Sequence, residues 1–198
     1  MNMAMGHLDS RRNEEPTMTL LHAKRPGLTD RNTLRAEARR SVSDGAVTVA
    51  YGADREAVIA MLQNALATEL TCALRYRQHH FVAKSPVSPA IKNEFLEHAN
   101  EEQQHADQIA ERIVQLGGAP DFNPASFAAR SDAEYVSGTE LRQMLIENLV
   151  AERIAVQAYT EMIHAIGESD PTTRRLLESI LAKEEEHADE LSDLLPRE

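Results

Sequence analysis

The 198-residue sequence contains a single cysteine, Cys72. One thiol cannot close a disulfide within the chain, and it cannot build the four-cysteine iron site of a rubredoxin module. No apolar run approaches the roughly 18 residues needed to span a bilayer. The amino terminus also lacks the basic region and apolar core that mark a secretory signal. These absences exclude a disulfide scaffold and predict a cytoplasmic protein with no membrane segment.

Basic residues are scarce relative to acidic ones. The chain has 21 Lys and Arg against 32 Asp and Glu, a net charge of −11. This excess argues against a generally basic nucleic-acid binder and suits a protein that concentrates cations. The charge is uneven, because residues 1–45 carry a net +2 and residues 46–198 carry a net −13.

Residues 1–45 are predicted to form an amino-terminal extension. Residues 1–25 show no apolar periodicity, so we expect them to be mobile. Asp30 is placed to cap a short helix over residues 31–42. The arginines of that helix suggest a DNA-binding arm, but a net +2 over 45 residues is small, so DNA binding is expected to be weak or absent.

A duplicated pattern dominates residues 46–198. Each copy reads Glu-x6-Tyr and then Glu-x2-His, and the two glutamates are 33 residues apart in the first copy and 32 in the second. The first copy consists of Glu69, Tyr76, Glu102 and His105, and the second of Glu152, Tyr159, Glu184 and His187. A lone Glu-x2-His on a helix means little, whereas its repetition at matched spacing predicts a site.

Helical geometry explains the spacings. Residues i and i+3 lie about 60° apart and about 4.5 Å along the axis, so a Glu-x2-His pair can hold one ion from one helix face. Residues i and i+7 nearly eclipse each other, which puts Tyr76 on the same face as Glu69. Two antiparallel helical hairpins would bring four carboxylates and two imidazoles together, the ligand set of di-iron and di-manganese bundle proteins.

Charge balance supports a metal site. Four buried carboxylates without counter-charge would cost several kcal/mol each or would protonate. Two divalent cations balance them, and oxygen and imidazole ligands suit iron, with manganese also possible. The predicted ligands are Glu69, Glu102, His105, Glu152, Glu184 and His187.

Apolar residues at helical spacing predict four long helices over about residues 54–84, 89–116, 140–166 and 171–194. Ser88 and Thr139 are expected caps, and Gly117-Gly118 and Gly167 are expected ends. Residues 119–138 contain prolines and are predicted to be a non-helical crossover. The predicted fold is all-α: a four-helix bundle over residues 46–198 with a long crossover between its second and third helices.

At its six predicted ligands the chain resembles the ferritin-like superfamily. It looks most like bacterioferritin, through the stretches Ala67–Tyr76, His105–Leu116 and Glu184–His187, and it also resembles the Dps-like mini-ferritins, which lack a fifth helix. The resemblance implies a ferroxidase that oxidises two Fe(II) with O2 or hydrogen peroxide and passes Fe(III) into a hollow shell, for iron storage, detoxification and oxidative-stress protection. It implies that Glu102 and Glu184 bridge the metals, while Glu69 with His105 and Glu152 with His187 each complete one metal position.

Departures from these families lead to two further expectations. Gln103 stands where bacterioferritin has its haem methionine, so no haem is expected. The sequence reaches Leu195–Glu198 directly after the fourth helix, without the fifth helix of bacterioferritin, so a homo-oligomer of twelve chains is expected, with a dimer as the fallback. The cysteine pair of mini-ferritins that carry a bacterioferritin-type site is missing.

Other residues and functions remain open. Tyr76 is expected to orient a ligand; Tyr159 either does so or is a core residue. Cys72 is expected to be a small buried residue. Glu97 and Glu101 either collect iron or form a solvated face. Four histidines outside the repeat are expected to be structural or exposed: His79, His80, His98 and His164. A rubrerythrin-like peroxidase or manganese catalase and a Dps-type DNA-protecting protein are the alternative functions.

Overall fold

The computed structural model describes residues 27–84 and 88–195, and the chain divides into two compact units at Arg40 and Ser41. In the first unit, helix α1 (Arg31–Arg40) has no buried residue. Asp30 accepts hydrogen bonds from the backbone N–H groups of Asn32 and Thr33 and so caps α1. The prediction that residues 1–25 are mobile lies outside the described residues.

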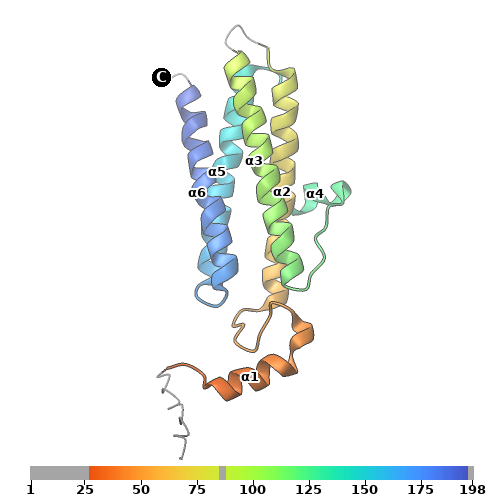
Figure 1. Cartoon of the computed structure of the whole chain (residues 1–198). Helices are drawn as coiled ribbons and strands as arrows, with labels where there is room; N and C mark the ends of the chain where they lie inside the picture. Colours follow the sequence, from red (N-terminus) through yellow and green to blue (C-terminus); the bar gives the residue numbers. More distant parts are fainter. Residues whose placement is uncertain (1–26, 85–87, 196–198) are drawn as a thin grey trace, which may run out of the picture. The chain divides into compact units, whose positions relative to one another are not determined.

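The second unit is a bundle of four long helices (Figure 1): α2 (Arg55–Val82), α3 (Ser88–Gln115), α5 (Leu141–Ile166) and α6 (Pro171–Leu194). The most extensive contacts join α2 to α3 and α5 to α6, so the bundle consists of two hairpins. The described residues contain no strand. The predicted all-α four-helix bundle with a long crossover is therefore confirmed.

Side-chain caps mark the start of two of the four long helices. Asp54 accepts from two backbone N–H groups at the start of α2, and Asp170 does the same for Thr173 at the start of α6. Gly167, with φ of 53°, ends α5 as expected. The predicted Thr139 cap is wrong: α5 begins at Leu141 without a side-chain cap, because the Thr139 hydroxyl bonds the Gln143 side chain instead.

The crossover contains helix, contrary to expectation. A 3₁₀ turn, η2 (Pro124–Ser126), leads into the single-turn helix α4 (Phe127–Arg130), which packs against α2. Asn123 caps this segment, and the Arg130 guanidinium donates to the backbone carbonyl of Gln63 on α2. Hydrogen bonds hold this helical turn. It has no apolar periodicity, which is why the sequence did not predict it.

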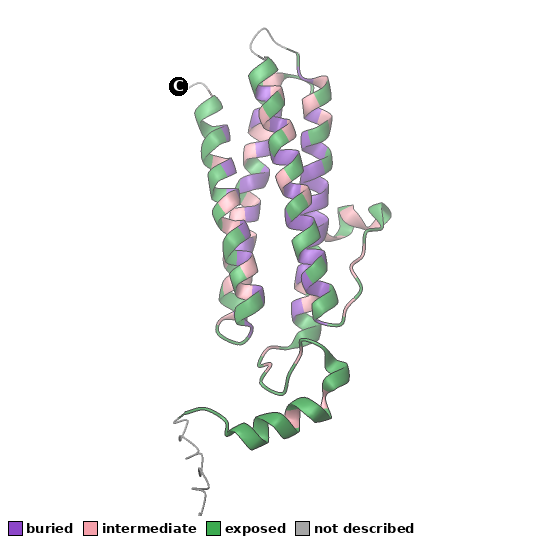
Figure 2. Ribbon diagram, viewed as in Figure 1, coloured by how far each residue is buried: buried purple, intermediate pink, exposed green. Residues whose placement is uncertain are grey.

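The buried faces of the four helices point into the bundle (Figure 2). One apolar cluster includes Leu62, Leu66, Ile109, Ile113, Leu177 and Ile180, and a second includes Tyr76, Phe95, Met144 and Leu191. The duplicated Glu and His residues lie between these clusters along each helix. The core thus positions a polar layer away from bulk water.

Helix α2 contains a long apolar stretch. Among the described residues it is the one helix long and apolar enough to cross a membrane, by length and composition only. However, 61% of its most apolar stretch is buried inside the bundle, and α2 also carries Glu69 and Arg75, both buried. Its apolar composition is accounted for by its place in the protein core.

Candidate metal centre

The four long helices bring the six predicted ligands together in two overlapping groups. In each group, one possible ligand atom per residue lies within 4.8 Å of all the others. The first group is Glu69, Glu102, His105 and Glu184, and the second is Glu102, Glu152, Glu184 and His187. Because Glu102 and Glu184 belong to both groups, the arrangement offers two adjacent cation positions with two shared carboxylates.

All six side chains are buried; His105, at 7%, is the most exposed. Seven of their oxygen and nitrogen atoms have no hydrogen-bond partner: Glu69 Oε2, Glu102 Oε1, His105 Nδ1, Glu152 Oε2, both Glu184 oxygens and His187 Nδ1. His105 Nδ1 approaches Glu184 Oε1 to 2.9 Å, but not with the angles of a hydrogen bond. Buried polar atoms without partners are costly, so this cluster is built for ligands.

Two tyrosines hold the outer carboxylates. Tyr76 donates a hydrogen bond to Glu152 Oε1, and Tyr159 donates one to Glu69 Oε1. Each bond crosses from one hairpin to the other. Tyr76 shares a helix face with Glu69 but donates to Glu152, the equivalent of Glu69 in the second copy. In both glutamates the second oxygen is left free to face the centre.

His105 and His187 differ in the residue that stands next to the ring on the side away from the centre. His187 presents Nδ1 to the centre, and its Nε2 lies 2.7 Å from Glu101 Oε2. Burial raises the pKa of Glu101, but its hydrogen bond to His187 prevails and the pKa is lowered overall. The position equivalent to Glu101 in the second copy is Lys183, a cation that cannot accept from His105. The duplicated centre is therefore asymmetric.

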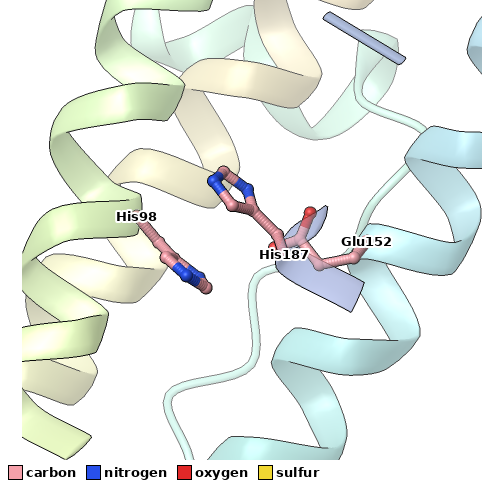
Figure 3. Close-up of side chains that lie close together, drawn as sticks. All are labelled: His98, Glu152 and His187. Carbon is pink, nitrogen blue, oxygen red and sulfur yellow. The ribbon is translucent and has the colours of Figure 1, made fainter. Parts of the chain in front are cut away.

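His98 is a part of the site that sequence analysis missed. Its ring is buried and stacked on His187, with centroids 4.1 Å apart (Figure 3). Its Nδ1 lies 3.1 Å from the Tyr76 hydroxyl. The signal was present, since His98 precedes Glu102 by four residues and so lies on the same helix face.

Arg75 is a second missed residue. Its buried guanidinium donates to Asn148 on α5 and to the Glu134 carbonyl in the crossover, both at 2.9 Å. It lies 3.7 Å from the Cys72 sulfur, and Cys72 is buried outside both ligand groups. Arg75 thus ties α2 to α5 behind the centre.

The remaining candidates lie outside the two ligand groups. His79 is buried and bonded to the Val136 carbonyl, and His80 is bonded to the Lys92 carbonyl. His164 and Glu97 are exposed. Sequence analysis correctly placed these three histidines as structural or exposed.

Without metal, protons compensate the carboxylates. Burial, together with repulsion by Glu102, raises the pKa of Glu69 to about 8, and burial raises that of Glu152 well above its ordinary value. Burial lowers the pKa of His105 and His187, but carboxylate contacts outweigh it and raise them to about 12 and about 11. Divalent cations that bind these ligands would displace protons from them.

Comparison with known proteins shows the family of this chain. The family model described as Ferritin-like domain matches residues 59–197, so the chain belongs to the ferritin-like family. A DNA protection during starvation protein of Pyrococcus furiosus is 32% identical over 148 residues, covering 73% of this chain and 80% of that protein. A nutrient stress-induced DNA-binding protein of Nostoc sp. is 33% identical, covering 63% and 70% of the two chains.

A solved structure extends the comparison. A bacterioferritin-related protein of Bacteroides fragilis, described as a dodecameric thioferritin, superposes with a TM-score of 0.69. It is 32% identical, and the match covers 72% of this chain and 86% of that one. The resemblance to the bacterioferritin and Dps-like group is confirmed.

Proposed function

We propose that this protein is a ferroxidase that oxidises Fe(II) at a carboxylate-bridged pair of metal positions, for iron storage, detoxification and protection from oxidative stress. The observation that carries the proposal is the pair of overlapping ligand groups with seven unpartnered buried atoms. Membership of the ferritin-like family supports it.

The residues fit two iron ions. Four carboxylates balance two divalent cations, and a set of oxygen and imidazole donors suits iron or manganese. Glu102 and Glu184 would bridge the ions, since each belongs to both groups. Glu69 with His105 would complete one position, and Glu152 with His187 the other.

In the proposed reaction, Fe(II) is the substrate and supplies one electron per ion to O2 or hydrogen peroxide. The chain itself orients and shields the site. Tyr76 and Tyr159 hold the outer carboxylates, and Glu101 holds the ring of His187. A cavity of about 200 Å³ beside His105 is lined by Gln104, Gln108, Ser179 and Lys183 among others, and it is the proposed route to the centre.

Iron oxidation by the purified protein tests the proposal. Wild-type protein in air should oxidise Fe(II) faster than buffer, and the E102A/E184A variant should not, because both shared carboxylates are gone. The matched control is E97A/E185A, which removes exposed glutamates next in sequence to His98 and Glu184. Equal rates for wild type and E102A/E184A would overturn the assignment.

A di-metal redox enzyme, such as a manganese catalase or a rubrerythrin-like peroxidase, would use the same donor set. The single cysteine counts against an accompanying rubredoxin module. Metal analysis of the protein as isolated separates these functions: manganese with catalase activity and no iron oxidation would favour the enzyme.

We further propose a closed homo-oligomer of twelve chains. The support is the relative from Bacteroides fragilis, whose description states a dodecamer, and closed symmetry is the common outcome for homo-oligomers. Light scattering should give about 264 kDa for twelve chains of 22.0 kDa. A mass near two chains would show the fallback dimer, which has no hollow shell in which iron could be stored.

A further inference from the structure

Among the described residues, Arg75 carries a buried positive charge with no carboxylate bonded to it. The residue is 1% exposed, and a guanidinium does not lose its proton in a protein. Its hydrogen bonds go to the Asn148 side-chain oxygen and the Glu134 backbone carbonyl, both at 2.9 Å, and to the Cys72 sulfur at 3.7 Å. Burial raises the pKa of Cys72 well above its ordinary value, so all three partners are uncharged.

Arg112 shows how this chain holds another buried guanidinium. Arg112 is 8% exposed, and its Nη2 donates to both carboxylate oxygens of Asp170 at 3.0 Å. A buried ion without a counter-charge is strongly unfavourable, so a buried cation is expected to have a compensating anion. The counter-charge of Arg75 therefore lies beyond its hydrogen-bond partners.

Carboxylates of the candidate metal centre supply that counter-charge. Arg75 directly precedes Tyr76, whose hydroxyl donates to Glu152. Its partner Asn148 lies one turn before Glu152 on α5. Burial lowers the pKa of Arg75, but acidic groups around it, with Glu152 and Glu102 among them, outweigh burial and raise it. The guanidinium thus lies within electrostatic range of the centre, and its hydrogen bonds fix it there.

The charge balance changes when ions occupy the centre. Four carboxylates neutralise two Fe(II) ions, so the Arg75 charge is then left without compensation. Once each ion has given one electron to O2 or hydrogen peroxide, the ions together carry two further positive charges. Repulsion between Arg75 and the ions therefore increases on oxidation.

We propose that Arg75 is a fixed positive charge that weakens the hold of the centre on its ions, and on Fe(III) more than on Fe(II), so that oxidised iron leaves. This role rests on the proposed function, in which iron is the substrate. A structural role is the alternative, because the guanidinium also joins α2 to α5 and to the crossover. Loss of a structural contact would loosen the ligands, whereas loss of the charge strengthens metal binding.

Zn(II) binding to the metal-free full chain separates these roles, because Zn(II) is not oxidised. R75Q removes the charge and keeps a hydrogen-bond donor, and its affinity for Zn(II) should rise about tenfold or more. R75K keeps a positive charge, and R77Q removes an exposed arginine from the same helix. Neither of these two variants should bind Zn(II) more tightly than wild type, because the charge near the centre is kept and the exposed one is screened.

N148D tests the same charge with Arg75 in place. Aspartate has the size of asparagine and keeps the oxygen that accepts from the guanidinium, and it adds the carboxylate that Arg75 lacks. N148D should therefore also bind Zn(II) more tightly than wild type. In iron-loaded protein the midpoint potential of the centre should be lower in R75Q and N148D than in wild type and R75K, because Fe(III) is then repelled less.

The outcomes separate this role from the proposed function. Unchanged or weaker Zn(II) binding in N148D would overturn the proposal, because that variant leaves the contacts of Arg75 in place. Tightening in R75K as large as in R75Q would also overturn it, since charge would not be the cause. Tighter Zn(II) binding in R75Q and N148D, in a protein whose wild type oxidises no iron, would support the effect of the charge and overturn the ferroxidase assignment alone.

Discussion

Tyr76 on α2 donates a hydrogen bond to Glu152 on α5, and Tyr159 on α5 donates one to Glu69 on α2. The two bonds cross between the hairpins, so each half of the duplicated chain orients a ligand of the other half. This exchange makes the geometry of the centre dependent on the pairing of the two hairpins.

Replacing either tyrosine by phenylalanine should weaken metal binding. Loss of a partner that orients a ligand typically costs about 10–100-fold in affinity. Y76F should act on the position held by Glu152 and His187, and Y159F on the position held by Glu69 and His105. Zn(II) competition titration measures both, with exposed Tyr135→Phe as the control. Unchanged affinity in Y76F and Y159F would show that the tyrosines merely fill the core.

Glu101→Gln should weaken one of the two positions selectively. The Glu101 carboxylate lies 2.7 Å from His187 Nε2 and supports that ring, whereas Lys183 occupies the equivalent place in the second copy. We expect about a tenfold or larger loss for one ion and little change for the other. The same titration measures it, with exposed Glu185→Gln as the control. Equal weakening of both ions would contradict the asymmetry.

Stability of the metal-free protein should fall as pH rises. In the folded chain the pKa of Glu69 is raised from 4.5 to about 8, and those of His105 and His187 from 6.5 to about 12 and about 11. The folded state therefore holds more protons than the unfolded state in these windows, and unfolding becomes easier as pH rises. This stabilisation is fully present below the pKa values of the unfolded chain, and it is lost as pH rises through the raised pKa values of the folded chain.

Thermal melting at about pH 6 and about pH 9 checks this prediction. The Tm of metal-free protein should be lower at the higher pH, and Zn(II) should remove most of the difference because the metal replaces the protons. The pKa values of Glu102 and Glu184 are lowered, so these two groups change the stability only below about pH 4.5, outside the pH range of this measurement. A higher Tm at pH 9 without metal would contradict the assignment.

DNA binding, despite the names of the relatives, should be weak. Residues 1–45 carry a net +2, and few phosphate contacts imply a low affinity that moderate salt is enough to abolish. We expect retardation of DNA to vanish near about 150 mM salt, and deletion of residues 1–25 to leave iron oxidation intact. Tight, salt-resistant binding that the deletion abolishes would favour a DNA-protecting arm.

Haem should not copurify with the protein. Gln103 occupies the position after the shared carboxylate Glu102, and its amide bonds Asp107 at 3.0 Å. An amide is a poor axial ligand compared with a thioether or imidazole. The absorption spectrum of freshly purified protein checks this, and a Soret band at one haem per two chains or more would show it wrong.

The sequence alone predicted the four long helices and the convergence of six candidate ligands. Spacings of three and seven residues fix which side chains share a helix face, because that geometry is local. Duplication of the pattern then predicted that two such faces meet. The structure brings Glu69, Glu102, His105, Glu152, Glu184 and His187 into two groups, as those spacings require.

Only the tertiary structure decided which residues support them. The exchange of tyrosines between hairpins, the stacking of His98 on His187 and the buried Arg75 each join residues from different elements. No periodicity records such contacts, because they depend on how the helices are rotated and packed against one another. The same packing placed Glu101, and not Lys183, behind a histidine, which makes a symmetric sequence pattern an asymmetric site.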